Sequence, residues 1–303
     1  MGQIAGRLVV LTGVNGTSCL PLIRISAEVV NIKKTQYGRE AMERTRKAWI
    51  NAILFAVTLA VNTMGALGVI NGLSQKEISD KYITLITPSS STFSIWSVIY
   101  ILLLISVILM IIRKDDDYYQ KAVDEISGLF RVSSILNIVW IVTFSYVLVE
   151  LSTLFILGFV ITLALLNLKL LKIQEGKRWL LPAAFGIYNG WLLVATVVNA
   201  AAALVKMGWT GFGLGVETWA VIMLALAVAL VILVMLKLRN AAFPLPVAWA
   251  YFGVHQYLKA PNGFQGQYGT AQTAALIGIA VLLCAAAYQF FRNRYTLLPA
   301  AGK

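Results

Sequence analysis

Aromatic and amide side chains recur at helical spacing in three apolar segments of the chain, and these are the residue types best suited to hold a ligand. In the first segment Phe93, Trp96 and Tyr100 stand at i, i+3 and i+7. This spacing places them within about 60° of one helix face. Rings can stack on a flat molecule, and a tyrosine hydroxyl two turns inside a membrane needs a partner. Helix capping by residues 89–92, with aromatics at the membrane interface, explains the stretch equally well.

A second face occurs in the segment 129–149. Ser133, Asn137, Trp140 and Phe144 follow one another at steps of four, three and four residues. An asparagine amide in hydrocarbon must find hydrogen bonds, so we expect Asn137 to point into a helix bundle. Bonding between helices and contact with a ligand both remain open for this face.

A third face occurs in the segment 180–204, where Tyr188, Trp191, Ala195 and Asn199 recur at i, i+3, i+7 and i+11. Small residues nearby let helices approach closely or leave space. Three segments that each bear a tryptophan and a polar partner on one face indicate a shared internal surface. A flat, largely apolar ligand with a few polar groups would suit it, and packing alone is the alternative.

We therefore predict one ligand-binding surface. Its predicted residues are Phe93, Trp96, Tyr100, Asn137, Trp140, Tyr188, Trp191 and Asn199. The three tryptophans would stack on the ligand or line its pocket, and the tyrosines and asparagines would donate hydrogen bonds or brace the helices. The apolar segments contain no carboxylate pair and no His–Asp set. We therefore expect no enzyme activity, no catalytic residue and no metal site.

Membrane-spanning helices are the elements that must hold these faces. The chain of 303 residues is 59% hydrophobic and 13% charged, with a mean hydropathy of +0.79, whereas a soluble domain carries roughly 25% charged residues. We predict an all-α, polytopic transmembrane helix bundle. The apolar runs that would span the membrane lie at about 50–73, 93–112, 129–149, 151–171, 180–204, 217–236, 243–258 and 272–291. The run at 243–258 is short and carries Pro244 and Pro246, so we expect a tilted or half-spanning helix there.

The net charge of +12 reflects topology and not nucleic-acid binding. The basic residues lie in short clusters between apolar runs, as orienting signals do, and no basic stripe with interleaved aromatics is present. With eight spans and both ends in the cytoplasm, sixteen lysines and arginines fall on the cytoplasmic side, with the five before Met42 left out. The other side holds four: Lys76, Lys81, Lys206 and Lys259.

Residues 1–41 differ from the rest of the chain. From Met42, the sequence MERTRKAWINAILF gives a basic cluster, an interfacial Trp49 and then the first apolar run. We hypothesise that Met42 is the natural initiator, and that residues 1–41 are an upstream segment or a disordered arm. Mass spectrometry that found a mature N-terminus well before Met42 would contradict this. Cys19 and Cys284 have no metal-site spacing.

Together the three faces resemble the tryptophan-rich sensory protein family, also called the translocator-protein or TspO/MBR family. Its signatures have counterparts in the second, third and fifth apolar runs: Pro88, Phe93, Trp96 and Tyr100; Asn137, Trp140 and Phe144; and Tyr188, Trp191, Ala195 and Asn199. The resemblance covers about residues 50–204. The family's tryptophan-bearing double-proline loop is reduced here to TPSSST, so a loop tryptophan that would touch ligand is absent.

The resemblance implies a five-helix TspO-like bundle over residues 42–205, followed by a C-terminal extension of about three transmembrane helices over 206–303. It implies a protein that binds, senses or translocates a hydrophobic planar ligand such as a porphyrin. No cofactor is required, and porphyrin or haem would enter as ligand. The implied partners are the lipid bilayer and a small hydrophobic molecule, with a homodimer left open. The implied location is a bacterial cytoplasmic (inner) membrane.

Other functions remain as alternatives. A secondary transporter for another small molecule would use broken helices, and the segment with Pro244 and Pro246 is the candidate, without a matching segment in the first half. His255 is either an axial haem ligand or an interfacial polar residue. The glycine-rich GWTGFGLG at 208–215 lies on the non-cytoplasmic side and follows no strand, so it is not a phosphate-binding loop.

Overall fold

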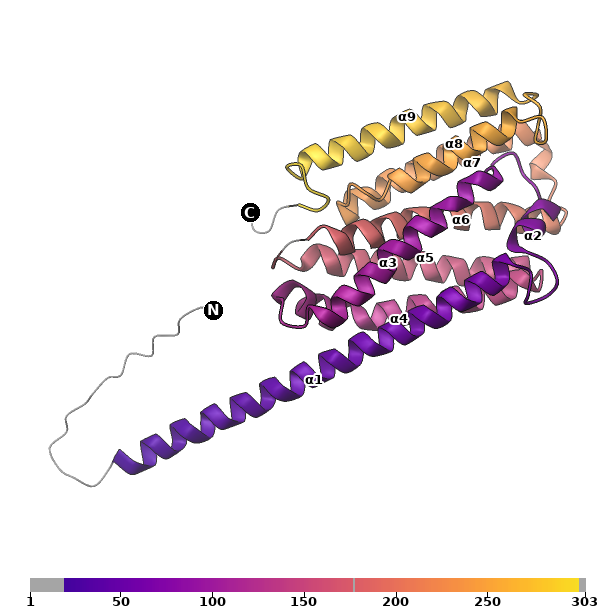
Figure 1. Ribbon diagram of the computed structural model, residues 1–303. Helices are drawn as coiled ribbons and strands as arrows, with labels where there is room; N and C mark the ends of the chain where they lie inside the picture. The colour runs from indigo at the N-terminus through magenta and orange to yellow at the C-terminus, as the bar shows by residue number, and fades with distance from the viewer. Residues whose placement is uncertain (1–18, 177, 300–303) are drawn as a thin grey trace. The chain divides into compact units, whose positions relative to one another are not determined.

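Every regular element that the computed structural model describes is a helix, in residues 19–176 and 178–299 (Figure 1). The elements are α1 (Cys19–Ala66), α2 (Gln75–Lys81), η1 (Ser90–Ser94), α3 (Ile95–Ile112), α4 (Asp117–Ser145), α5 (Val149–Lys172), α6 (Leu180–Lys206), η2 (Gly211–Gly213), α7 (Val216–Leu238), α8 (Leu245–Lys259) and α9 (Gly269–Arg292). This confirms the predicted helical bundle.

Seven helical stretches among the described residues are long and apolar enough to cross a membrane. They are Thr35–Ala66, Ser90–Ile112, Asp117–Ser145, Val149–Lys172, Leu180–Lys206, Val216–Leu238 and Gly269–Arg292. The eighth apolar run forms α8, which has 15 residues, fewer than the roughly 20 that a crossing needs. Seven spans therefore qualify by length and composition where the sequence predicted eight.

The prolines at the start of α8 begin the helix and do not break it. Pro244 is its N-cap residue and Pro246 lies in its first turn. Proline is tolerated there because the first amides of a helix have no intrahelical acceptor. The segment is one continuous short helix, as the shortness of the run predicted.

The chain divides into two compact units, residues 1–43 and 44–303. In the first unit, residues 19–43 form the N-terminal part of α1. The prediction for residues 1–41 falls in part on residues 1–18, outside the described residues, and residues 19–41 are helical.

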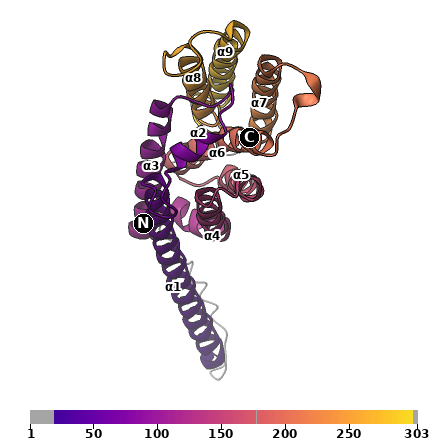
Figure 2. The ribbon, with the colours of Figure 1, turned by 90° about the vertical axis from the view of Figure 1, so that its right-hand side faces the viewer.

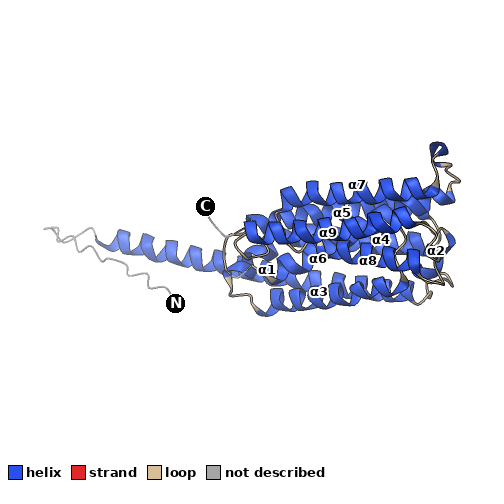
Figure 3. Cartoon of the chain, turned by 90° about the horizontal axis from the view of Figure 1, so that it is seen from above, coloured by secondary structure: helices blue, strands red, loops and turns tan. Residues whose placement is uncertain are grey.

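Helix α6 is the centre of the second unit. In Figure 2, α4 and α5 lie on one side of α6, and α7, α8 and α9 lie on the other. The helices α3 to α9 run alongside one another with loops at the two ends (Figure 3). In α6, 67% of the most apolar window is buried inside the protein, more than in the other six spans. Helix α6 therefore contacts other helices on both of its sides.

Two glycines let the C-terminal helices approach the earlier ones closely. A Cβ atom on Gly190 of α6 would lie 2.1 Å from the backbone oxygen of Phe243. A Cβ atom on Gly253 of α8 would lie 1.9 Å from the hydroxyl of Thr92, in η1 just before α3. Both contacts exclude any side chain at these positions, because the space is occupied.

Buried asparagines tie the spans together. Asn51 of α1 donates to the Ser127 hydroxyl of α4 at 2.9 Å, and Asn167 of α5 donates to the Phe185 carbonyl of α6 at 3.0 Å. Asn240, before α8, donates to the Pro182 carbonyl at 2.8 Å. Such bonds are worth roughly 1 kcal/mol each in a membrane, so they fix the register between helices.

Candidate functional site

Trp96 lies at the centre of a group of rings that we call the tryptophan cluster: Phe93, Trp96, Tyr100, Trp140, Tyr188 and Trp191. The Trp96 ring centroid lies 5.3 Å from that of Tyr100, 6.4 Å from Trp140, 6.2 Å from Tyr188 and 6.2 Å from Trp191. These separations are those of favourable aromatic pairs. The structure thus brings together rings from η1, α3, α4 and α6.

The first rings of the cluster lie in η1 and at the start of α3. Phe93 lies in η1, just before α3, and packs edge-on against Trp191 with centroids 6.0 Å apart. Trp96 and Tyr100 follow within α3 and stack at an interplanar angle of 18°. The indole of Trp249 on α8 donates to the backbone oxygen of Thr92 at 2.9 Å. A helix of the C-terminal part therefore holds the segment that carries Phe93.

Asn137 uses its amide to join three helices beneath the rings. Its amide nitrogen donates to the Tyr188 hydroxyl at 2.7 Å, and its oxygen accepts from Asn62 at 2.8 Å. Asn137 is fully buried. Both ends of the amide are therefore used within the protein, which fits the interpretation of this residue as a bond between helices.

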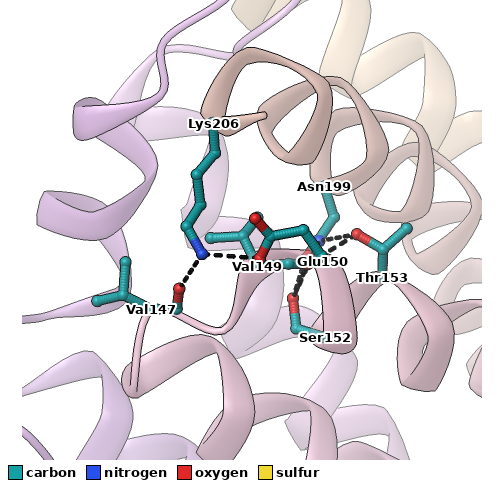
Figure 4. Close-up of polar contacts among 7 residues, drawn as sticks. All are labelled: Val147, Val149, Glu150, Ser152, Thr153, Asn199 and Lys206. Atoms are coloured by element: carbon teal, nitrogen blue, oxygen red, sulfur yellow. Dashed lines mark hydrogen bonds and ion pairs between the residues drawn. The ribbon is translucent and has the colours of Figure 1, made fainter. Parts of the chain in front are cut away.

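Asn199 also joins helices beside the cluster, and Figure 4 shows its contacts with the first turn of α5. Its oxygen accepts the indole N–H of Trp140 at 3.1 Å. Its nitrogen donates to the Val149 carbonyl at 3.2 Å and to the hydroxyls of Ser152 and Thr153 at 3.0 and 2.7 Å. Asn199 therefore fixes the first turn of α5 against α6. The N–H of Trp140 is already satisfied by the Asn199 oxygen.

Lys206 secures the turn that precedes α5 (Figure 4). Its ammonium donates to the Val147 carbonyl at 2.8 Å and pairs with Glu150 at 2.7 Å. Val147 has a positive φ of 60°, a conformation that costs a β-branched residue energy. The lysine thus stabilises a strained turn beside the cluster.

A small cavity lies against the tryptophan cluster, with a volume of about 70 Å³. Five of the eight predicted ligand-binding residues line it: Phe93, Trp96, Trp140, Trp191 and Asn199. The other three, Tyr100, Asn137 and Tyr188, do not line it, although both tyrosine rings pack against Trp96. The volume is well below the roughly 300–1,000 Å³ of sites for drug-sized molecules.

Two residues that line the cavity each carry a buried side-chain N–H donor without a hydrogen-bond partner among the described residues. The donors are the indole nitrogen of Trp191 and the side-chain nitrogen of Gln75. A buried donor without an acceptor costs about 1–3 kcal/mol. An acceptor group that reached either nitrogen would remove this cost.

Sequence reasoning missed the contribution of α2, which brings Gln75 and Ser79 to the cavity. The signal was present as the capping box of Ser74 and Glu77. Glu77 accepts from the backbone N–H of Ser74 at 2.7 Å, and the Ser74 hydroxyl accepts from the Glu77 N–H at 3.2 Å. The bonds from the Ser74 backbone and side chain hold the pKa of the Glu77 carboxyl below its ordinary value.

His255 does not line this cavity. Its Nδ1 lies 3.4 Å from the Gln272 carbonyl, and the residue faces a polar hollow formed by residues 89–91 and 255–262. Its place fits the interfacial polar residue better than an axial ligand to a porphyrin at the tryptophan cluster.

Comparison with known proteins adds to this geometry. A family model described as TSPO-like protein matches residues 48–288. The chain belongs to the TSPO-like family. The matched range confirms the resemblance carried by the three tryptophan-bearing faces, and it extends through α7 and α8 into α9. No curated protein and no solved structure matched this chain.

Proposed function

We propose that this membrane protein of the TspO class binds a flat hydrophobic molecule, such as a tetrapyrrole, at the tryptophan cluster, in order to sense or translocate it. The N–H of Trp191, which has no hydrogen-bond partner among the described residues, is the observation that carries the proposal. Packing alone gives no reason to bury a donor without an acceptor beside an empty space, because the cost is about 1–3 kcal/mol. A carbonyl or ring nitrogen of a ligand would supply the acceptor.

The size of the cavity sets a condition on binding. About 70 Å³ corresponds to roughly two water molecules, whereas a tetrapyrrole is several times larger. The walls from α4 and α6 are fixed to each other by Asn137 and Asn199. The wall from α2 and Pro88 belongs to the connection between two spans, and among the described residues no buried amide bond ties α2 to α4 or α6. We infer that this wall moves outward when ligand enters.

The test is a titration of the full chain in lipid nanodiscs with protoporphyrin IX, followed by tryptophan quenching. Trp191→Phe keeps a ring but removes the N–H, so it should raise Kd by roughly tenfold. Trp179→Phe is the matched control, because Trp179 is 61% exposed and lies outside the cavity. Quenching that does not saturate, or an equal Kd for both variants, would contradict the proposal.

A further inference from the structure

A second and larger cavity lies where α6 ends and α7 begins, and we call it the outer cavity. Its volume is about 510 Å³, within the range of small-molecule sites. Its walls come from residues 83–86, the end of α6, the loop at 209–214, the start of α7, and residues 264 and 268 between α8 and α9. Three stretches that are distant in sequence, residues 83–86, 201–223 and 264–268, thus border one space.

Helix α6 separates the outer cavity from the tryptophan cluster. Val198 and Ala202 line the small cavity, whereas Ala201 and Val205 line the outer one. The two linings share no residue. The outer cavity is therefore a separate space, and occupancy of one does not fill the other.

The glycine-rich loop builds one wall of the outer cavity. Four of its residues have positive φ: Gly208, Gly211, Phe212 and Gly213. Glycine adopts this conformation at little cost, so the loop can fold back on itself. The fold places the ring of Trp209 4.8 Å from that of Trp219, whose indole donates to the Gly211 carbonyl at 2.5 Å. The loop serves as a scaffold for two indoles.

The chemistry of the lining selects an uncharged ligand. None of the described residues that line the outer cavity is a lysine, arginine, aspartate or glutamate, and its hydroxyls come from Thr84, Thr210 and Tyr268. A carboxylate or ammonium placed there would lose its water without gaining a counter-charge, which is costly. The two propionates of a porphyrin therefore do not suit this space.

The shape of the lining selects a ring system. Four aromatic residues line the cavity: Trp209, Trp219, Phe264 and Tyr268. Rigid rings stack on another flat ring with little loss of side-chain entropy. Flexible acyl chains gain less from such walls, because they must be straightened against them.

We propose that the outer cavity is a second binding site, for an uncharged molecule with a flat system of two or three rings and one carbonyl or hydroxyl group. This inference goes beyond the proposed function, because its residues and its ligand chemistry both differ from those of the tryptophan cluster.

The test is photolabelling of the full chain in nanodiscs with benzophenone, a neutral two-ring ketone, followed by mass spectrometry of the labelled peptides. Labelling should saturate, should fall on residues 201–223 and 83–86, and should be displaced by the neutral ring ketone fluorenone. Fluorenone carboxylic acid, which is ionised at neutral pH, should not displace the label. Labelling that spreads evenly over lipid-exposed helices, or that oleyl alcohol displaces as well as fluorenone does, would overturn the proposal.

Two variants sharpen the test. Met223→Trp fills the outer cavity from α7 and should reduce saturable labelling roughly tenfold. Leu226→Trp adds the same side chain to the same helix at a position that is 50% exposed and should change nothing. If Met223→Trp does not fold, Trp209→Leu removes one aromatic wall from a loop and should weaken labelling. Equal labelling in every folded variant would refute the site.

The two proposals fail separately. Met223→Trp should leave the protoporphyrin titration unchanged, and Trp191→Phe should leave benzophenone labelling of residues 201–223 unchanged.

Discussion

At the scale of single residues, Asn137 and Asn189 differ in one respect that matters for stability. Asn137 donates to Tyr188 and accepts from Asn62. Asn189 is just as buried, but neither its nitrogen nor its oxygen has a partner among the described residues. The two asparagines should therefore respond in opposite ways to the same substitution.

Asn137→Leu should lower the free energy of unfolding by about 1–2 kcal/mol, because it leaves the Asn62 amide with one acceptor fewer and Tyr188 without a donor. Asn189→Leu should be neutral or stabilising, because it removes unpaired polar atoms and keeps a similar volume. Chemical denaturation in detergent, followed by circular dichroism, measures both. An equal loss in the two variants would show that packing and not hydrogen bonding holds Asn137.

The tryptophans show what spacing along one helix can and cannot predict. The intervals between Trp96, Trp140, Trp191 and their neighbours correctly predicted that their faces point inward and meet. They could not predict that the Trp140 N–H bonds to Asn199, whereas the Trp191 N–H has no partner in the part of the chain that the structure describes. That difference depends on the axial register of α4 against α6, which two separate sequence patterns do not encode.

At the scale of elements, α2 depends on one capping box. The Ser74 bonds lower the pKa of Glu77. The ionised Glu77 carboxylate therefore stabilises α2 fully at pH values above the ordinary carboxyl pKa. This stabilisation is lost as the pH falls through the lowered pKa of Glu77. We expect amide hydrogen exchange in residues 75–81, corrected for its intrinsic pH dependence, to show greater opening at acid pH. Glu77→Gln should remove this pH dependence, and a persisting dependence would assign it to another group.

The close approach of α6 to the segment before α8 gives a second prediction at this scale. Gly190→Ala should destabilise the protein by about 1–3 kcal/mol, because its Cβ would lie 2.1 Å from the Phe243 backbone oxygen. Gly128→Ala is the matched control, since nothing lies within 4 Å of a Cβ there. The control should be neutral or slightly stabilising, because alanine favours a helix interior. Thermal unfolding in detergent compares the two, and equal midpoints would contradict the tight contact.

Sequence patterns predicted the long elements well and the short ones poorly. The apolar runs found α3 and α5 to α9 within a few residues, because a bilayer-length run has few other structures available to it. They missed α2, a helix of seven residues whose signal is only a capping box. They also started α4 at 129, although the helix begins at Asp117, because its polar first turns extend beyond the apolar run.

At the scale of the whole molecule, the charge asymmetry predicts which ends of the spans face the cytoplasm. Phe212→Cys, in a loop residue that is 83% exposed, should react with a membrane-impermeant maleimide on intact cells. Lys114→Cys should react only after the cells are opened, because its loop lies at the basic ends of the spans. Cys19 and Cys284 are replaced by serine beforehand. The reverse labelling pattern would invert the topology.

One stretch of chain, residues 83–93, contributes to both cavities. Residues 83–86 line the outer cavity, and Pro88 and Phe93 line the small one. If a ligand in one cavity repositions this stretch, it changes the free energy of binding in the other, and the two occupancies are then thermodynamically linked. Linkage is reciprocal: if fluorenone shifts the protoporphyrin Kd by some factor, protoporphyrin must shift the fluorenone Kd by the same factor.

Titration of each ligand at saturating levels of the other measures this factor, and a value of one would mean that the shared stretch transmits nothing. A factor different from one would make this protein a receptor whose response to one molecule is set by the presence of another.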